Sequence, residues 1–553
     1  MKCSDLRARY DALCSLRKNQ DDTMQQIERF VVPFRGEFFR DMSSEQEVMW
    51  RRRFIYDSTA VQACQTLAAS IQGSLTSAAI KWFILAFQNE QLMKDHEARV
   101  WLEGVEEEIF RELQESNFDM ESSEFYLDLT SFGTGILVEE EKLDAKGDFI
   151  EVDFSSAPIR DCHFEHDSRG NVLRFYRRFQ WTPVQIKDKF GDKIPREVKD
   201  ILATSSGTSD IDRKYDIIFS IFERPEYKTA DTTRMLAALK RPYGFKWFMH
   251  KDSELLGEEG GYYEMPAFAA RWRKVNGSRW GFSPAYVALS DILTLNELVE
   301  ASLESVGKVV DPAIITTQRG LLSDLDLGRG GLTVVREMDQ IAPFESRARF
   351  DVADMKIERL QQSINAAFFV DQLQLKESPA MTATEVMVRY ELMQRLLGPT
   401  LGRLEADYLD PLVKRTLNIL HRNKRLPEMP SIVEDLEGQF HIEYTGPLPR
   451  AQKQDTSQSV LNWVGVIGQL AEVTPEMLDV MDVDSIARGL GDLSSVPKKF
   501  LRSEKEVKKI RKERQEKINT MESAEAARAT GEGMEAMGKG REALGGELGM
   551  IEQ

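Results

Sequence analysis

The chain of 553 residues has few cysteines and no long apolar run. Its cysteines are Cys3, Cys14, Cys64 and Cys162. Four thiols spaced so widely do not make a disulfide framework, and we expect them to stay reduced. The N-terminus has no apolar signal region, and the most apolar window, Ala78–Phe87, is far shorter than the roughly 20 residues that cross a bilayer. We therefore expect a protein that is neither secreted nor membrane-spanning and has no membrane partner.

Positive charge is also in short supply. The sequence has 73 lysines and arginines against 91 aspartates and glutamates, which gives a net charge of −18 and a pI near 5.1. A protein that grips nucleic acid by neutralising phosphates would present a basic surface, so the composition argues against that class. It does not exclude a protein that must let DNA pass without sticking.

The sequence has no nucleotide-binding or hydrolase motif. No GxxxxGK[ST] or GxSxG pattern occurs, and the nearest glycine cluster, Gly328–Gly331, is better explained as a turn. The cluster Cys162–Asp167 contains metal-ligating residue types, but its spacing matches no recurrent zinc pattern, and we expect a surface turn. The acidic runs Glu106–Glu108 and Glu139–Glu141 are expected to lie on solvated faces. We therefore expect no enzyme activity, catalytic residue, metal site or cofactor.

The N-terminal part of the chain shows helical periodicity. In residues 1–35 the apolar face consists of Leu6, Tyr10, Leu13 and Leu16. Further helices are predicted from Ser58, as N-cap, to Ala79, over Leu92–Glu115 and over Ser122–Phe132.

From Gly133 on, apolar residues recur at every second position, which is the period of a β-strand. A hairpin is predicted around Ala145–Asp148, and a strand over Val172–Trp181. Thr182 is the expected N-cap of a short helix. Later strands are expected to be interrupted by Gly257 and Gly260–Gly261. The N-terminal 280 residues are therefore predicted to form one α+β body, with helices first and an antiparallel sheet second.

The stretch Gly281–Asn423 combines three long helices with a β-rich excursion. A helix over about Pro284–Val310 is followed by the excursion Asp311–Phe350 and by a second helix over about Val352–Leu373. After the break Gln374–Thr382, a third very long helix runs to about Arg422. Two helices that leave and return with a β module between them indicate a stalk rather than a fold around a pocket.

Local signals refine the second half of this stretch. Ser378–Pro379 cannot continue the second helix. Thr382 and Glu385 form a capping box, so the third helix is expected to begin sharply there. Gly398–Pro399 removes a backbone hydrogen bond and predicts a bend, and Asp410–Pro411 is a second interruption.

Beyond residue 452 the pattern predicts a pair of helices and then a highly charged helix. The basic run Lys505–Lys517 of this last helix is interleaved with glutamates, which predicts a salt-bridged helix face rather than a nucleic-acid contact. The end of the chain, from about Thr530, is rich in Gly, Met and Glu, and we expect it to be frayed or disordered.

Four sets of motifs carry a resemblance to a known family. They are Ala63–Ser77 with Lys81–Phe83, Leu127–Leu137, Arg271–Lys274 with Gly277–Asn296, and Met381–Met387 with Leu397–Leu404. In this order and at these separations, the chain resembles the portal (head-to-tail connector) protein of short-tailed, podovirus-type bacteriophages over roughly residues 1–490.

The resemblance implies a helix-dominated α+β portal fold. Its parts would be a wing at 1–280, stem helix one at 281–310, a β-containing clip at 311–351, stem helix two at 352–373, a channel loop at 374–382, a kinked wing helix at 383–425, a wing strand and linker at 426–451, a helical crown at 452–520 and a C-terminal tail at 521–553.

The resemblance also implies a function and partners. Twelve subunits would form a ring at one capsid vertex, through which double-stranded DNA is packaged and ejected without sequence specificity. The implied partners are the terminase large subunit, head–tail adaptor and tail proteins, major capsid and scaffolding proteins, and internal core proteins. The protein would be made in the host cytoplasm and become part of the virion.

Candidate site residues follow from this assignment. The channel-loop candidates for DNA contact are Lys376, Glu377, Ser378 and Pro379. The stem and clip candidates for weak contact with phosphates are Lys308, Arg319 and Arg329. The expected helix kink lies at Gly398 and Pro399. Elsewhere the acidic subunits would repel DNA, which suits a channel that must not hold it.

Two other functions compete with this hypothesis. One is an internal virion protein of the ejection apparatus, and the predicted stem–clip–stem order argues against it. The other is a DNA-packaging enzyme, and the absence of a Walker A pattern and of a clustered carboxylate metal site argues against that.

Overall fold

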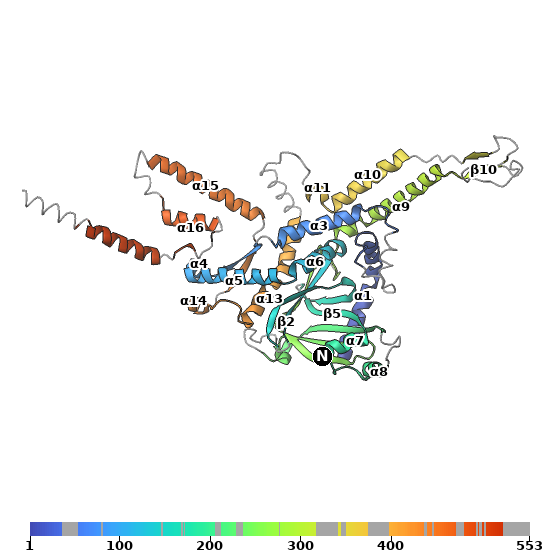
Figure 1. The fold of residues 1–553 in the computed structure, drawn as a ribbon, viewed down its shortest axis with the longest axis horizontal. Helices are drawn as coiled ribbons and strands as arrows, with labels where there is room; N and C mark the ends of the chain where they lie inside the picture. The colour runs from blue at the N-terminus through green and yellow to red at the C-terminus, as the bar shows by residue number, and fades with distance from the viewer. Residues whose placement is uncertain are drawn as a thin grey trace, which may run out of the picture. The chain divides into compact units, whose positions relative to one another are not determined.

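The structure, a computed structural model, divides the chain into two compact units (Figure 1). The first unit consists of Met1–Ile84, Val105–Pro427 and Ile442–Ala451, and the second of Leu85–Gly104, Glu428–His441 and Gln452–Gln553. The residues described are 1–35, 53–78, 81–144, 147–167, 170, 172–204, 212–227, 236–275, 277–316, 334, 341–343, 350–373, 397–435, 439–444, 447–471, 481–493, 496, 500–502, 505–521 and 523.

Helix outweighs strand in the described chain, and both are present, so the predicted helix-dominated α+β class is confirmed. The helices up to residue 204 are α1 (Cys3–Phe30), α3 (Thr59–Leu75), α4 (Glu90–Lys94), α5 (His96–Glu115), α6 (Phe118–Phe132), α7 (Pro183–Phe190) and α8 (Arg196–Thr204). The later ones include α14 (Ser431–Asp435), α15 (Pro447–Ala471) and α16 (Val483–Leu493).

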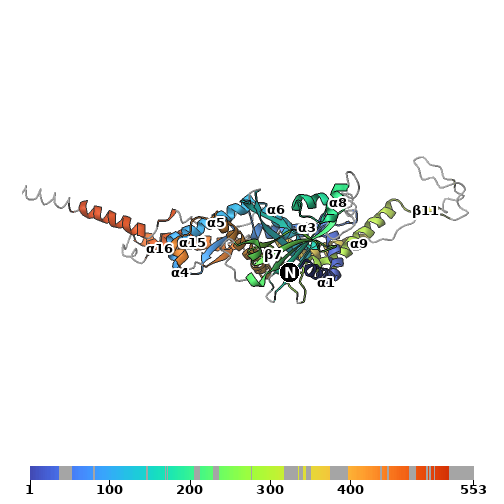
Figure 2. The same ribbon diagram turned by 90° about the horizontal axis from the view of Figure 1, so that it is seen from below.

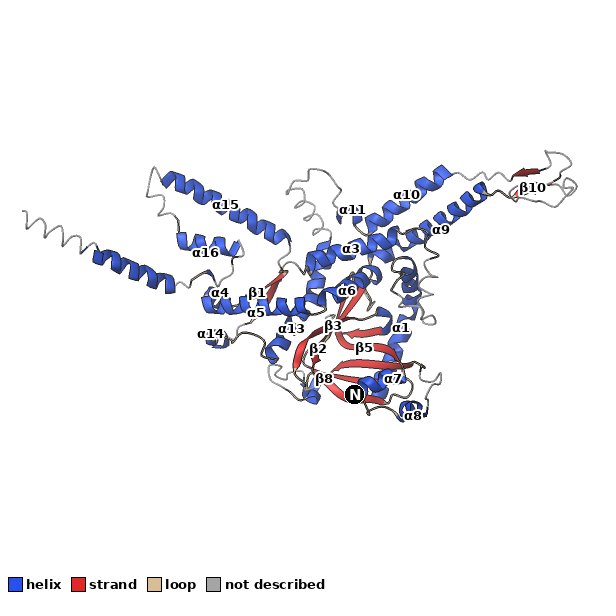
Figure 3. Cartoon of the chain, viewed as in Figure 1, coloured by secondary structure: helices blue, strands red, loops and turns tan. Residues whose placement is uncertain are grey.

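The two larger antiparallel sheets of the structure lie in the first unit (Figure 3). The five-stranded sheet has the order β4 (Cys162–His166), β5 (Val172–Trp181), β6 (Tyr215–Glu223), β7 (Tyr243–Met249) and β8 (Leu255–Tyr262). The three-stranded sheet has the order β3 (Phe149–Ser156), β2 (Thr134–Leu143) and β9 (Ala267–Arg271). The short strands β1 (Phe83–Phe87) and β12 (Phe440–Tyr444) pair with each other.

Helix α1 covers one face of the five-stranded sheet. Leu6, Tyr10 and Leu13 pack in one cluster with side chains of β5, β6 and β7. The prediction that Leu16 shares this face is wrong, because its side chain is 63% exposed and Arg17 is buried instead. The guanidinium of Arg17 donates to two backbone carbonyls beside β4, at 2.8 and 2.9 Å, so its polar head is satisfied inside the protein.

Several local predictions are confirmed and others need correction. The hairpin β2–β3 and the strand β5 are present, and Thr182 caps α7 in a capping box with Gln185. Helix α3 begins where Ser58 predicted, but Asp57 provides the cap by accepting from the backbone N–H of Thr59 at 2.8 Å. The helix expected over 92–115 is divided at Asp95 into α4 and α5.

The cluster Cys162–Asp167 is not a surface turn. Cys162–His166 is the edge strand β4, and its first four residues are buried. Glu165 receives hydrogen bonds from Arg174, at 2.8 Å, and from Arg9. The carboxylate of Glu165 is therefore paired with arginines, and residues on both faces of the strand are buried.

The prediction that glycines interrupt the strand β8 is wrong. The strand continues through Gly257 and Gly260, and a bulge shifts its register against β7 between Phe245 and Trp247. A Cβ on Gly260 would lie 2.1 Å from the ring of Phe245. Glycine here makes room for a cross-strand aromatic ring rather than ending the strand.

The backbones of Gly133 and Gly281 are in contact where α6 ends and shortly before the long helix α9 (Pro284–Val310) begins. A Cβ on Gly281 would lie 1.9 Å from the carbonyl oxygen of Gly133, and Gly133 has a φ of 78°. The N–H of Gly281 donates to Thr134 Oγ1 at 2.9 Å, and Ser283 Oγ donates to the carbonyl of Ser131 at 2.5 Å. The contact requires glycine on both sides and fixes where α9 starts.

Replacing Gly281 with alanine is expected to lower the free energy of unfolding by about 1–3 kcal/mol, because the new Cβ would collide with main chain rather than with a movable side chain. The shift of the urea midpoint of the purified protein measures this loss.

Gly402→Ala is the matched control. Gly402 is helical and exposed, with nothing within 4 Å of an added Cβ, so alanine there should stabilise by about 0.5–1 kcal/mol. Equal midpoints for the two variants would show that the backbone contact does not constrain the fold.

Candidate functional site

A pair of long helices leads away from the sheets of the first unit. They are α9 (Pro284–Val310) and α10 (Phe350–Ala367), which pack side by side, and Figure 1 and Figure 2 both show α9 running outwards to the strands β10 and β11. Strand β10 (Ile314–Thr316) pairs antiparallel with β11 (Ile341–Pro343). The helix predicted at Pro284–Val310 is confirmed at those bounds.

The second helix of the pair is shorter than predicted. Helix α10 ends at Ala367, and a separate short helix, α11 (Val370–Leu373), follows. Phe369 between them has a φ of 59°, which a helix cannot contain. Phe368 and Val370 are buried, so packing of the side chains on either side holds this bend.

Polar contacts tie the inner half of the pair to residues 54–57. The side chain of Asn296 donates to the carbonyl of Phe54 at 3.0 Å and accepts from the N–H of Tyr56 at 2.8 Å. The hydroxyl of Tyr56 donates to Glu300 at 2.8 Å. Gln361 of α10 donates to Asp57, also at 2.8 Å, so both helices are held by the same segment.

The outer half of α9 exposes apolar side chains. Leu303, Val306 and Val310 are 55%, 44% and 78% exposed, and with Val299 they follow the 4-3-4 spacing of one helical stripe. Met355 of α10 is also exposed. We call Val299, Leu303, Val306 and Val310 the apolar stripe. Val299 is half-buried and the three outer members are exposed, so the stripe is a candidate interface.

A third long helix returns to the sheets. Helix 397–404 continues through a π turn, Glu405–Leu409, into α13 (Asp410–Arg422). The N–H of Asp410 donates to the carbonyl of Glu405, five residues earlier. Pro411 has no N–H for a regular turn, and the π turn accommodates this, so the interruption predicted at Asp410–Pro411 is present.

Arginines fasten this helix to the three-stranded sheet. Arg403 donates to the carbonyl of Trp272 at 3.0 Å, and Arg271 of β9 lies 3.7 Å from Asp407 in the π turn. Deeper in the fold, Arg415 is buried and donates to the carbonyl of Glu139 at 3.3 Å.

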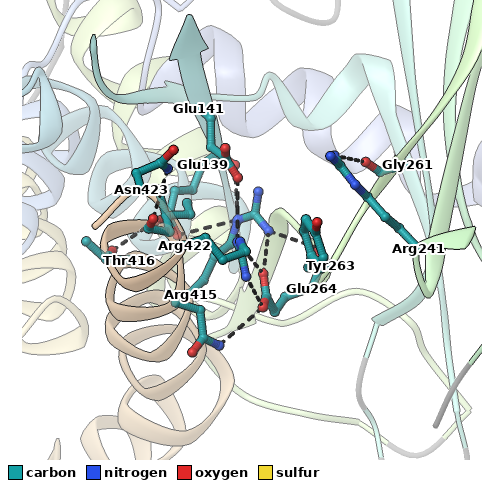
Figure 4. Close-up of polar contacts among 12 residues, drawn as sticks. Glu139, Glu141, Arg241, Gly261, Tyr263, Glu264, Arg415, Thr416, Arg422 and Asn423 are labelled. Carbon is teal, nitrogen blue, oxygen red and sulfur yellow. Dashed lines mark hydrogen bonds and ion pairs between the residues drawn. The ribbon is translucent and has the colours of Figure 1, made fainter. Parts of the chain in front are cut away.

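Glu264 joins Arg415 to a second arginine of α13, Arg422, as Figure 4 shows. Its carboxylate accepts from Arg415 at 3.2 Å and from both terminal nitrogens of Arg422 at 2.8 and 3.2 Å. Arg422 also lies 3.5 Å from Glu141. We call Glu139, Glu141, Glu264, Arg415 and Arg422 the arginine clamp. The two-pronged contact between Arg422 and Glu264 fixes orientation as well as distance, and it holds α13 against the connection between β8 and β9. Glu139 and Glu141 add contacts between α13 and β2.

For Glu139, a residue of the arginine clamp, the sequence-based prediction of its environment is wrong. It was expected on a solvated face, yet it is fully buried, and Thr416 donates to it at 2.9 Å. Burial raises the pKa of its carboxyl to about 8, against the lowering effects of Arg415 and Thr416. Its strand lies between β3 and β9 with α13 against it, a covering that period-two alternation does not reveal.

The sequence-predicted site residues lie mostly outside the described residues. These are Lys376, Glu377, Ser378, Pro379, Arg319 and Arg329, together with the capping box at Thr382 and Glu385. Lys308 is exposed near the end of α9. Gly398 and Pro399 lie in helix 397–404, at the start of a described segment, so a bend there stays a prediction.

No group of three or more His, Cys, Asp or Glu residues in the described chain is placed to hold a metal ion. No helix among the described residues is long and apolar enough to cross a membrane.

Arg415→Met is expected to lower the free energy of unfolding by about 1–3 kcal/mol, because the carbonyls of Glu139 and Glu264 and the carboxylate of Glu264 lose a donor while the apolar stem is kept. Chemical denaturation measures the loss. Lys414→Met on the same helix is the control: Lys414 is exposed with its nearest carboxylate 3.9 Å away, so its effect should stay within about 0.5 kcal/mol. Equal losses would show that the clamp contributes nothing.

Glu139→Gln tests the raised pKa through the pH dependence of stability. A glutamate in an unfolded chain titrates near pH 4.3. Between that pH and about 8 the folded protein keeps a proton that the unfolded chain releases, so wild type loses stability as pH rises from about 5 to 8. The neutral glutamine lacks this loss. Urea midpoints are measured for both proteins at several pH values. As the pH rises from about 5 to 8, the midpoint of the wild type should fall relative to that of Glu139→Gln. If the two midpoints change in parallel, Glu139 is ionised in the folded protein.

Comparison with known proteins places the chain among phage proteins. The family model for the bacteriophage head to tail connecting protein matches residues 4–501. The probable portal protein of Bordetella phage BPP-1 is 27% identical over 509 residues, which are 90% of this chain and 88% of that protein. The portal protein of Salmonella phage epsilon15 is 28% identical over 470 residues, 83% of this chain and 81% of that one.

Among solved structures, a chain of the virion of the native gene transfer agent particle aligns at 10% identity over 76% of this chain and 90% of its own length. Its TM-score of 0.34 is too low to bear on the fold.

The family match spans the sheets, the helix pair, the clamp and most of the second unit. The resemblance predicted from sequence is confirmed, and the protein is a structural connector and a component of the phage virion, not an enzyme. The chain belongs to the bacteriophage head-to-tail connecting protein family, the portal proteins of phages.

Proposed function

We propose that this chain assembles into a closed ring, of twelve subunits, at one vertex of the capsid, and that double-stranded DNA enters and leaves through its centre. The observation that carries the proposal is the apolar stripe on α9. Four apolar side chains in a row on a helix that leaves the body are unfavourable in water and favourable against a neighbouring copy. Contact between different faces of identical subunits closes into a ring when the rotation allows it.

The helix pair would then be the stem of the ring. Pro284–Val310 is 27 residues long, and a helix of that length spans roughly 40 Å, enough to cross a capsid vertex. Residues 1–280 would be the wing, and 452–520 the crown. The clip, 311–351, would dock the terminase large subunit during packaging and head–tail adaptor and tail proteins afterwards. Capsid, scaffolding and internal core proteins would contact the wing and crown.

Charge supports a channel that does not hold its cargo. Each subunit has a net charge of −18, and α9 carries Glu297 and Glu304 seven residues apart, on one side of the helix. A ring of such subunits repels phosphates over most of its surface. Weak contacts with DNA would come from Lys308, Arg319 and Arg329 and from the channel loop, 374–382, whose tip carries Lys376, Glu377, Ser378 and Pro379.

The arginine clamp would resist the load of packaging. The channel loop precedes helix 397–404, which is joined to α13, so force on the loop passes to the helix that the clamp fixes on β2. The two-pronged ion pair between Arg422 and Glu264 holds an orientation that apolar packing alone would leave free to slide.

Val306→Glu tests the ring. A carboxylate in the apolar stripe would be buried without a partner in the subunit contact, at a cost of about 1–3 kcal/mol or more for each interface. The fraction of protein sedimenting as a ring should fall at least about tenfold at fixed concentration, and negative-stain images should show single subunits.

The control is Val184→Glu, since Val184 is also exposed, at 51%, but lies on α7 away from the stripe. If both variants form rings with an axial hole as well as wild type does, the stripe is not the interface; if wild type forms no ring, the proposed function is wrong.

A further inference from the structure

The second unit contains a helix whose charge is opposite to that of the chain. Residues 505–521 are helical and carry seven lysines and arginines against three glutamates, a net charge of +4, within a chain of net charge −18. Lys505, Lys508, Lys509 and Lys512 are spaced i, i+3, i+4 and i+7, which places them on one face. We call these four residues the lysine stripe. All four are exposed.

The lysine stripe is not the salt-bridged face predicted from the sequence. Within the described part of the chain, Glu513 and Glu516 form no ion pair with these lysines, although their i, i+4 spacing would allow it. Arg511 is the cation of this helix that a described carboxylate binds. Its two terminal nitrogens donate to Asp484 at 2.6 Å each. The ammonium groups of the stripe are therefore left to solvent or to a partner.

The helix contacts α16 through residues outside the stripe. The pair between Arg511 and Asp484 holds it against α16, and Arg488 of α16 donates to the carbonyl of Arg502 just before it. Val507 and Ile510 lie on the side of the helix opposite to the stripe and are half-buried. The anchored face and the charged face are thus different faces of one helix.

We propose that the lysine stripe binds the phosphate backbone of double-stranded DNA without reading its sequence. Four ammonium groups along about 10 Å of helix face a polymer with about one charge per 1.7 Å of axis. Lysines act as point charges for phosphates and do not make the two-pronged contacts that identify bases.

An anionic membrane fits the helix less well. Interfacial helices bury a broad apolar face with Trp, Phe or Leu, whereas the non-polar residues here are Val507, Ile510, Ile518 and Met521. The inference rests on the proposed function for its setting, since a ring would gather one stripe from each subunit around DNA and add their weak affinities.

The experiment measures binding of the full-length, assembled protein to a labelled 30-base-pair duplex of arbitrary sequence at several salt concentrations. The test variant replaces Lys505, Lys508, Lys509 and Lys512 with glutamine. Each phosphate contact contributes about −0.9 to the slope of log K against log [salt], so the slope should become shallower by about 3–4 for each bound stripe. Affinity near 0.1 M salt should fall at least about tenfold.

Three controls make the result specific. Arg514→Gln with Lys517→Gln removes two cations of the same helix outside the stripe and should leave the slope within about 2 of wild type. Replacing the four lysines with arginine keeps the charge and should keep the binding. Negative-stain imaging of each variant shows whether rings form, which separates failure of this inference from failure of the proposed function.

An unchanged slope and affinity in glutamine variants that still form rings would overturn the proposal. Loss of binding to vesicles of anionic lipid, with duplex binding retained, would overturn it as well and assign the stripe to a membrane. Loss of duplex binding in the glutamine variant, with binding kept in the arginine variant, would support it.

Discussion

The backbone contact between Gly133 and Gly281 is the constraint on which the first unit depends. At this point the end of α6, the start of β2, the end of β9 and the start of α9 meet without a side chain between them. The N–H of Trp272 donates to the carbonyl of Gly133 at 2.9 Å, so Gly133 also extends the β2–β9 ladder by one hydrogen bond. Main chain in direct contact cannot adjust by changing a rotamer, and the direction of the helix pair follows from it.

The arginine clamp provides the second fixed point, and its physics differs. Glu139 and Arg415 are both inaccessible to water, yet their closest ionic atoms are 3.8 Å apart. That separation is too long to compensate for the lost hydration of two full charges. Hydrogen bonds to Glu264 and to backbone carbonyls occupy Nε and one terminal nitrogen of the guanidinium, and the other terminal nitrogen has no hydrogen-bond partner among the described residues. Glu139 keeps its proton near neutral pH. The clamp therefore gains specificity of position more than stability.

The parts that sequence could predict are those decided by neighbours in the chain. The bounds of α9 and the cap at Thr182 follow from periodicity and local hydrogen bonds. The errors at Glu139 and Leu16 are of another kind, because a segment distant in sequence decides which face is covered. Thr416, which donates to Glu139, lies 277 residues further along the chain. The family resemblance correctly predicted that the chain is a head-to-tail connector protein. The channel loop that it also implied lies outside the described residues.

The π turn at Glu405–Leu409 acts as a phase shift between two halves of one helix. A regular α-helix advances about 100° per residue, so Arg403 and Arg415 would point about 120° apart. The additional residue of a π turn removes about 100° of that rotation. Arg403, Arg415 and Arg422 then fall on nearly one line and reach the same side of the sheet. Pro411 thus does more than interrupt the helix. The π turn before it rotates the two halves of the helix so that their arginines point in nearly the same direction.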